Sequence, residues 1–192
     1  ELPERVRLAL PDLDFPPLRN LLASVVLANT AKLETAEGEQ VRVVGDPTEG
    51  ALLTLDAKAG APRESVLPGH PIVREIPFDS DRKRMTVVTL GARGGEVVHT
   101  KGSCDVLLPL CVAVETERGV VPLGDEGRAE LQALADRMSE KALRVLAVAR
   151  RERARGSDDD GAPSDVEQRL TFVGLVGMID PPREGVREAV RA

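Results

Sequence analysis

Two β-rich runs, residues 85–90 and 96–100, are joined by the five residues Gly91-Ala92-Arg93-Gly94-Gly95. Glycines between two β-rich runs favour a turn, so this stretch predicts a β-hairpin. A second hairpin is expected over residues 112–121, turning near Gly119. Further strands are expected at residues 40–44, 72–76, 144–149 and 170–179. The sequence therefore predicts an α+β fold in which an antiparallel β-sheet of about seven strands is flanked by helices.

Three helices have recognisable starting points. Pro17 can open a helix because the first helical turn does not need the N–H that proline lacks. Asp46 before Pro47 is a candidate N-cap, and Glu49, three residues after Asp46, can return a hydrogen bond to that cap. The clearest helix begins at Gly124 or Asp125. Its buried side is expected to carry Leu131, Leu134, Ala135 and Met138.

Two stretches are predicted to be exposed loops. Residues 56–71 are rich in Ala, Gly and Pro, and residues 152–168 hold a run of Asp with Gly, Ser and Pro. The triplet at 158–160 is better explained as a solvated charged loop than as a metal site.

Composition excludes several classes of protein. The 192 residues carry a net charge of −6, which argues against a nucleic-acid binder. The two cysteines, Cys104 and Cys111, lack paired spacing, so a zinc site that includes His99 is disfavoured and a reducing compartment is favoured. No apolar run approaches the length of roughly 18 residues that a membrane helix needs. The chain begins at Glu1 without Met, and we expect it to be a piece of a longer protein and a monomer.

Phe78 is one of only three aromatic residues, and it opens a charged segment that continues through Lys83 to Met85. Phe15 lies in a Pro-rich stretch and Phe172 in a strand that is expected to be buried. An exposed ring beside cationic side chains suits a purine nucleotide, because the ring stacks on the base and the cations face the phosphates. The spacing alone leaves a second interpretation open, in which Phe78 is a core residue at a strand end.

The other candidates also have ordinary explanations. Lys83 and Arg144 are surface charges in the simplest interpretation, and Lys101 is a hairpin-edge lysine that discourages aggregation. No Walker-type loop, dinucleotide fingerprint, G-x-S-x-G elbow or H-E-x-x-H helix occurs in the sequence.

Five segments spread along the chain carry a stronger signal when they are taken together. They are Gly45-Asp46-Pro47-Thr48-Glu49-Gly50-Ala51-Leu52, Pro77-Phe78-Asp79-Ser80-Asp81-Arg82-Lys83-Arg84-Met85, Lys101-Gly102, Leu143-Arg144-Val145-Leu146-Ala147, and Val176-Gly177-Met178-Ile179-Asp180-Pro181-Pro182-Arg183. In their order and rough spacing they resemble the cytosolic nucleotide-binding domain of P-type ATPases, ion pumps that pass through an aspartyl-phosphate. The resemblance is greatest to the calcium-pump and sodium-pump branch of that family.

This resemblance implies a role for each candidate in binding ATP. Phe78 would stack on adenine, Glu49 would accept from the adenine amino group, and Lys101 would line the pocket floor. The remaining implied contacts are Gly102 allowing close backbone approach, Lys83 and Arg144 facing the phosphates, and Leu146 packing on the nucleoside. Where a calcium pump of the family has Arg two residues after the Phe, this chain has Ser80, so one phosphate contact is either missing or supplied by Arg82. The usual Lys-Gly-Ala-Pro is Lys101-Gly102-Ser103-Cys104 here, and the reactivity of Cys104 is left open.

The resemblance also implies a domain organisation. Residues 1–16 would be a lead-in, 17–178 the nucleotide-binding domain, and 179–192 a hinge (Asp180, Pro181, Pro182, Arg183) followed by the start of a phosphorylation domain. The family's Asp-Lys-Thr-Gly-Thr segment, which carries the phosphorylated Asp, does not occur in the sequence.

The expected function is that of the ATP-binding, cytoplasmic domain of a cell-membrane pump that transports cations, with calcium as a guess within the branch. The expected ligands are ATP or ADP, with Mg²⁺ accompanying ATP, and the expected partners are the phosphorylation and actuator domains of the same parent chain. The isolated chain is expected to bind nucleotide weakly, without hydrolysing it and without entering the membrane. The alternatives are a stand-alone binding or interaction module with the same fold and, less favoured, a kinase-like enzyme.

Overall fold

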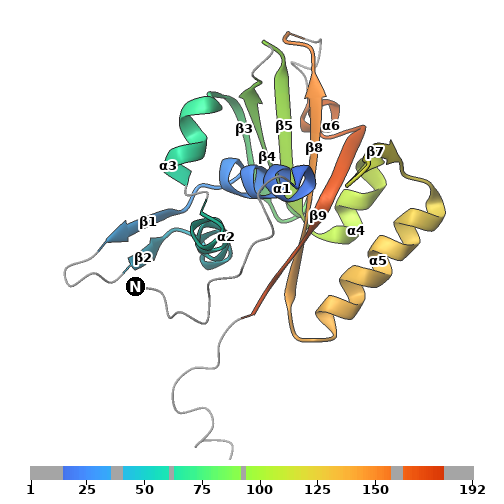
Figure 1. Ribbon diagram of the computed structural model, residues 1–192, viewed down its shortest axis with the longest axis horizontal. Helices are drawn as coiled ribbons and strands as arrows, with labels where there is room; N and C mark the ends of the chain where they lie inside the picture. The colour runs from blue at the N-terminus through green and yellow to red at the C-terminus, as the bar shows by residue number, and fades with distance from the viewer. Residues whose placement is uncertain (1–14, 36–40, 61–62, 92–93, 157–161, 180–192) are drawn as a thin grey trace, which may run out of the picture.

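A seven-stranded β-sheet organises the described part of the chain, with strand order β3-β4-β5-β8-β9-β6-β7 (Figure 1). The computed structural model describes residues 15–35, 41–60, 63–91, 94–156 and 162–179. Neighbouring strands are antiparallel except β6 and β9, which are parallel. The strands are β3 (Ile72–Asp79), β4 (Arg84–Leu90), β5 (Glu96–Gly102), β6 (Cys111–Thr116), β7 (Gly119–Pro122), β8 (Arg144–Arg153) and β9 (Leu170–Met178). The predicted α+β class and both predicted hairpins are confirmed.

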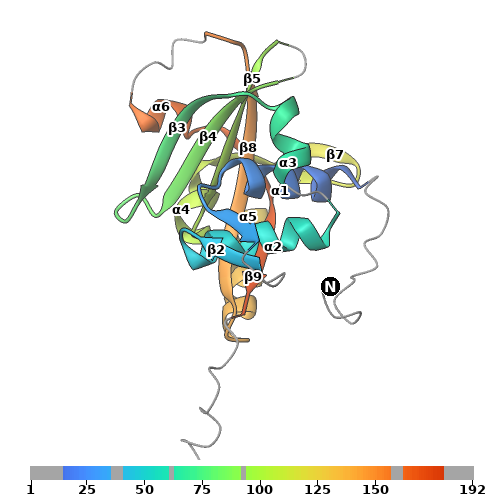
Figure 2. The ribbon, with the colours of Figure 1, turned by 90° about the vertical axis from the view of Figure 1, so that its left-hand side faces the viewer.

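Helices cover both faces of this sheet (Figures 1 and 2). One face, which we call the α1 face, is covered by α1 (Pro16–Leu27), α2 (Pro47–Lys58) and α3 (Arg63–Val66). The opposite face, the α5 face, is covered by α4 (Cys104–Leu107), α5 (Asp125–Ser139) and α6 (Pro163–Val166). The remaining elements are the two-stranded sheet of β1 (Lys32–Thr35) and β2 (Val41–Val44), and two short 3-10 helices, η2 (Leu67–Gly69) and η3 (Leu108–Leu110).

Each face of the sheet has its own apolar core, because successive side chains of a strand point to opposite faces. On the α5 face, Val98 of β5 packs with residues that include Leu107, Ala147 and Phe172. On the α1 face, Val148 of β8 packs with Val25 of α1 and Leu52 of α2, among others. Full burial of each large aliphatic side chain stabilises the fold by about 1.5–3 kcal/mol. The two helical layers are therefore held to the sheet independently.

Two of the three expected helix starts agree with the structure, and α1 begins at Pro16, one residue before the expected Pro17. Pro47 begins α2, and Asp46 caps it through Oδ1, which accepts from the backbone N–H groups of Thr48 (2.8 Å) and Glu49 (3.2 Å). Helix α5 begins at Asp125 after Gly124. Leu134 differs from the expectation: it was predicted to be buried, yet 41% of it is exposed.

Both predicted loops contain regular structure. In the first, residues 56–71, α2 continues to Lys58 and is followed by α3 and η2. In the second, residues 152–168, β8 continues to Arg153 and α6 follows. Composition favoured loops there, but hydrogen bonds to neighbouring elements extend β8, which pairs with β5 as far as Glu96↔Arg153.

Asp56 of α2 is a source of pH-dependent stability. It is fully buried, and neither carboxylate oxygen has a hydrogen-bond partner within the described structure. Burial without a partner raises the pKa of Asp56 from 3.8 to about 8. The protonated form is therefore the one that the fold accommodates.

We expect this group's contribution to stability to be complete below its unfolded-state pKa and to be lost as pH rises through about 8. Between those limits the free energy of unfolding should fall by up to about 1.4 kcal/mol per pH unit. Asp56→Asn, which keeps the shape and cannot ionise, should flatten this dependence. Urea unfolding of both proteins from pH 5 to 8.5 measures it, and parallel pH profiles would contradict the assignment.

Candidate functional site

A β-bulge in β3 determines which face Phe78 occupies. Ile76 pairs with Thr86 and Asp79 pairs with Arg84, so three steps along β3 oppose two along β4. Directly paired residues share a face, and Ile76 belongs to the core of the α5 face. Asp79 therefore lies on the α5 face and its neighbour Phe78 on the α1 face. The ring is 65% exposed, so the interpretation of Phe78 as a core residue is wrong.

A buried ion pair joins α2 to the centre of the sheet on this same face. Lys101 Nζ of β5 lies 2.7 Å from Glu49 Oε1, and the two side chains are only 8% and 11% exposed. The capping alternative for Glu49 is wrong, because its carboxylate reaches Lys101 and the segment after α1. The edge-lysine alternative is also wrong, because β5 lies between β4 and β8.

The two oxygens of Glu49 are used differently. Oε2 accepts from the backbone N–H groups of Thr30 (2.9 Å) and Ala31 (3.1 Å) and from the Thr30 hydroxyl (2.6 Å). Oε1 accepts from Lys101, and a carboxylate oxygen can accept a second bond. Burial acts to raise the pKa of Glu49, but the hydrogen bonds from Lys101 and Thr30 outweigh it and hold that pKa below its ordinary value. Burial lowers the pKa of Lys101, and the pairing with Glu49 opposes this.

Strand β8 brings Arg144 and Leu146 to the same face. Val148 pairs with Lys101 and therefore lies on the α1 face. Because side chains alternate along a strand, residues 144 and 146 lie on that face as well. Leu146 packs against the apolar core there. Arg144 Nη1 donates to Thr48 Oγ1 (2.6 Å), which fixes the start of β8 beside the N-terminus of α2. Sequence reasoning did not assign Thr48 a role, although it lies between Pro47 and Glu49.

Lys83 and Gly102 meet where the turn after β3 approaches β5. Lys83 has φ +49°, in the left-handed region, and its N–H donates to Asp79 O (2.7 Å). Its ammonium lies 3.8 Å from Asp105 Oδ2, and both side chains are more than half exposed. A Cβ on Gly102 would lie 2.7 Å from Lys83 O, so glycine is needed for the turn to lie against β5. The close approach that Gly102 allows is made by this turn.

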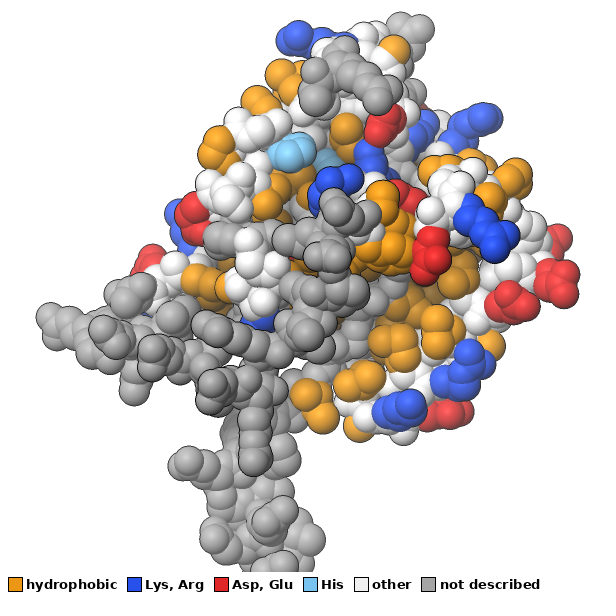
Figure 3. Space-filling model, in the orientation of Figure 1, with side chains coloured by type: hydrophobic (Ala, Val, Ile, Leu, Met, Phe, Trp, Pro, Cys, Tyr) orange, Lys and Arg blue, Asp and Glu red, His pale blue; other side chains and the backbone are white. Residues whose placement is uncertain are grey.

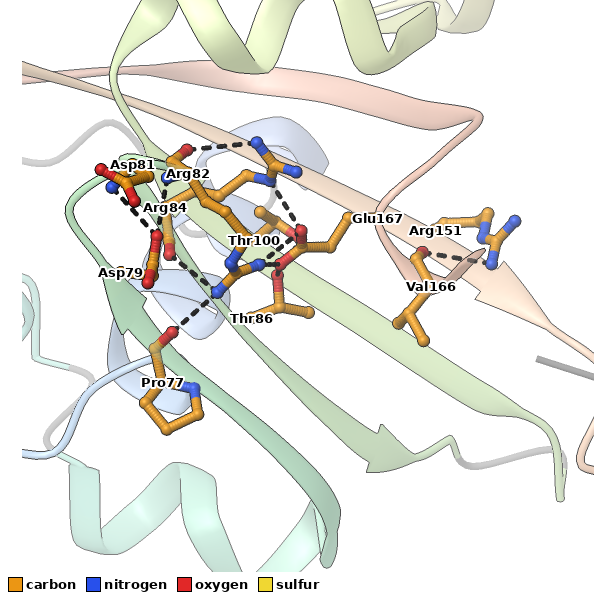
Figure 4. Close-up of polar contacts among 10 residues, drawn as sticks. All are labelled: Pro77, Asp79, Asp81, Arg82, Arg84, Thr86, Thr100, Arg151, Val166 and Glu167. Atoms are coloured by element: carbon orange, nitrogen blue, oxygen red, sulfur yellow. Dashed lines mark hydrogen bonds and ion pairs between the residues drawn. The ribbon is translucent and has the colours of Figure 1, made fainter. Parts of the chain in front are cut away.

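Glu167 is a central residue that sequence reasoning missed (Figure 4). Its fully buried carboxylate on the α5 face binds Arg82 (Nη1 to Oε1, 2.6 Å) and Arg84 (Nε to Oε2, 2.7 Å). The sequence left open whether Arg82 supplies the phosphate contact that Ser80 lacks; the structure instead directs Arg82 to Glu167. Nothing in the sequence marks Glu167, which follows an acidic stretch and precedes a strand.

The cysteines and His99 lie apart. His99 on the α1 face contacts Ser24 (2.9 Å) and Thr89 (3.2 Å), whereas Cys104 and Cys111 are in the core of the α5 face. Burial raises the pKa of Cys104 to about 11, so its thiol stays protonated at neutral pH. Within the described ranges, no cluster of three or more His, Cys, Asp or Glu residues could hold a metal ion.

A seven-stranded, mostly antiparallel sheet with helices on both faces is consistent with the fold of the cytoplasmic N domain of P-type ATPases. Residues 17–185 match the family model described as "P-type ATPase, cytoplasmic domain N", and the chain belongs to this family. This agrees with the expected cytoplasmic location. The expected hinge, residues 180–183, and the lead-in as far as residue 14 lie outside the described residues.

Curated relatives are full-length transport ATPases. The chain is 37% identical over 178 residues to a calcium-transporting ATPase of Bacillus subtilis, covering 93% of this chain and 20% of that protein. It is 38% identical over 179 residues to the cation-transporting ATPase pma1 of Synechocystis, covering 92% and 19%. It is 33% identical over 189 residues to calcium-transporting ATPase 1 of Lactococcus lactis, covering 98% and 21%. The chain thus spans about a fifth of the length of these relatives.

The distribution of surface charge and the length of the helices complete the description. On the face drawn in Figure 3, basic and acidic side chains of the described residues are interspersed. Among the described helices, none is both long enough and apolar enough to cross a bilayer.

Removing Lys101 should be costly because it leaves the Glu49 carboxylate buried without its cation. We expect Lys101→Met to lower the free energy of unfolding by about 3 kcal/mol. Lys83→Met, which removes an exposed pair, should cost about 1 kcal/mol or less. Urea unfolding measures both variants. Combining Lys101→Met with Glu49→Gln should cost less than the sum of the two single changes, and equal effects of Lys101→Met and Lys83→Met would contradict a buried pair.

Proposed function

We propose that this chain binds ATP or ADP on the α1 face, with the adenine ring stacked on Phe78. The observation that carries this proposal is the bulge in β3, which turns an exposed aromatic ring onto the face that holds the Glu49–Lys101 pair. Phe78 and Lys101 are two strands apart, a spacing of about 10 Å. An adenine ring that stacks on Phe78 can therefore reach the ion pair with its polar edge.

Glu49 and Lys101 are suited to recognise that edge. Glu49 Oε1 retains room for one more donor, and the adenine amino group is a donor. Lys101 has three N–H donors, and adenine ring nitrogens are acceptors. Leu146 lies on the same face beyond the end of β5, where it can pack on the nucleoside. Gly102 supports this arrangement by letting the turn that carries Lys83 lie against β5.

Lys83 and Arg144 supply positive charge for the phosphates. Lys83 is held only by an exposed pair with Asp105, which costs little to exchange for a phosphate. Arg144 is exposed and donates to the Thr48 hydroxyl, a neutral partner. Mg²⁺ would arrive with ATP, bound to its phosphates. Lys83 precedes Arg84, and Arg144 lies three residues before Ala147. Because Arg84 and Ala147 both pair with Gly102, both cations would meet the triphosphate toward that end of β5.

In the parent protein, this domain would hold ATP so that its γ-phosphate reaches an Asp in the phosphorylation domain. Positioning of this kind is a large part of catalysis in phosphoryl transfer. Residues 17–178 would form the nucleotide domain, and Asp180 to Arg183 the hinge that lets it move against the phosphorylation and actuator domains. Relatives that are calcium-transporting ATPases, one of them of the plasma-membrane type, support a membrane pump for cations, with calcium as the transported ion.

Phe78→Ala should weaken ATP binding by roughly 5- to 150-fold, the equivalent of about 1–3 kcal/mol of base stacking. Val73→Ala is the matched control, because Val73 is also an exposed apolar residue of β3. Titration with ATP followed by NMR measures all three affinities. Equal affinity of wild type and Phe78→Ala would rule out the stacking assignment.

The isolated chain should bind nucleotide without turning it over. Its sequence contains no Asp-Lys-Thr-Gly-Thr segment, so the phosphate acceptor of the family is not in this chain. Phosphate release from MgATP, compared with a protein-free blank, checks this expectation. Release above the blank that follows the protein through purification would show that the chain has its own hydrolytic site.

A further inference from the structure

We propose that Glu167 is a positioning residue for the nucleotide site, acting through the sheet from its α5 face. We call Glu167, Arg82, Arg84 and Thr86 the Glu167 cluster (Figure 4). The inference deepens the proposed ATP-binding function and rests on it. It concerns how Phe78 and Lys83 are held by residues that Glu167 binds, namely Arg82 and Arg84.

Glu167 has no spare hydrogen-bonding capacity for a ligand. Oε1 accepts from Arg82 Nη1 (2.6 Å) and the Thr86 hydroxyl (2.7 Å), and Oε2 accepts from Arg82 Nη1 (2.7 Å) and Arg84 Nε (2.7 Å). Four bonds occupy the acceptor positions of a carboxylate. The side chain is also fully buried. Its function is therefore to hold the two arginines.

Arg82 passes this constraint to Phe78. While Nη1 binds Glu167, Nη2 donates to Pro77 O (2.8 Å). The peptide unit is planar, so fixing the carbonyl oxygen of Pro77 fixes the orientation of the N and Cα atoms of Phe78. This is the position at which the bulge turns the strand. The ring of Phe78, exposed on the opposite face, thus has its backbone anchored by a buried ion pair.

Arg82 and Arg84 also bracket Lys83. Lys83 is a non-glycine residue in the left-handed region, a conformation that persists only where its surroundings enforce it. Both neighbours are bound to one carboxylate, and Arg84 Nη1 donates back to Arg82 O (3.1 Å). Two sets of contacts therefore hold the turn that carries Lys83. Glu167 binds the residues on either side of Lys83, and the Lys83 N–H donates to Asp79 O within the turn.

The loop that carries Glu167 is itself attached to the sheet. Glu167 N–H donates to Pro163 O (3.0 Å) at the start of α6, and Arg151 Nη2 of β8 donates to Val166 O (3.2 Å). Residues more than 80 positions apart in the chain are joined in this way. A shift of α6 or of this loop would change the orientation of the 79–83 turn.

Glu167→Gln tests the inference, with Glu96→Gln as the matched control. Glu96 also forms a largely buried ion pair, with Arg153 (2.8 Å), but at the other end of β5, about 20 Å from Gly102. Arg82→Lys is a milder variant that keeps a cation near Glu167 but has no second nitrogen to reach Pro77 O. It carries the test by itself if Glu167→Gln does not fold.

The first measurement uses the protein without nucleotide. We expect hydrogen exchange of the Lys83 amide to accelerate about tenfold or more in Glu167→Gln, as its bond to Asp79 O opens, and the NMR signals of the Phe78 ring to shift. Glu96→Gln should leave both unchanged. If Lys83 and Phe78 respond alike in the two variants, or in neither, Glu167 is not a positioning residue.

The second measurement is titration with ATP. Glu167→Gln and Arg82→Lys should raise the Kd about fivefold or more, and Glu96→Gln less than about twofold. Equal weakening by Glu96→Gln would mean that general destabilisation explains the loss, and the inference would fall. If wild type itself does not bind ATP while Lys83 and Phe78 respond only to the Glu167 cluster, the proposed function fails and the positioning of this turn stands.

Discussion

The buried ion pair between Glu49 and Lys101 is the interaction on which the α1 face depends. It joins the first turn of α2 to a central strand across 52 residues of chain. Removing two charges from water costs several kcal/mol for each ion, so such a pair is weak evidence of a gain in stability. Glu49 offsets part of this cost with three further hydrogen bonds, from Thr30 and Ala31. The presence of the pair is better explained by what it positions, namely two polar groups in the middle of an apolar face.

Strand β5 relates this pair to the Glu167 cluster. Lys101 points to the α1 face, and Thr100 points to the α5 face, where its hydroxyl lies 2.9 Å from that of Thr86. The two charged centres are therefore back to back across a single strand. In the proposed site, Phe78 and Lys83 act together with the Glu49–Lys101 pair. Their backbone positions, however, are held by the Glu167 cluster. This arrangement gives a rigid support to a ring that is itself exposed.

Features that depend on residues close together in the chain could be predicted. Features that depend on strand register or on contacts between distant residues could not. The cap at Asp46, the start of α5 and both hairpins depend on residues close together in the chain, and the sequence predicts them correctly. The five segments predicted that Glu49, Lys101, Arg144 and Leu146 belong to one site, and in the structure these residues lie on one face of the sheet. The face of Phe78, by contrast, depends on a register shift between β3 and β4, which no local pattern reveals. The direction of Arg82 depends on Glu167, 85 positions away.

For the proposed ATP site, the surrounding charges point to the base, more than the phosphates, as the main source of affinity. Lys101 is committed to Glu49, and Lys83 has Asp105 nearby, so much of the positive charge is already balanced before a nucleotide arrives. The chain as a whole carries a charge of −6, which does not attract an anion from a distance. Stacking is insensitive to these charges and needs only an exposed, well-held ring. If the domain binds ATP as proposed, its affinity would depend most on the orientation of Phe78, whose backbone is anchored from the opposite face of the sheet through Arg82 and Glu167.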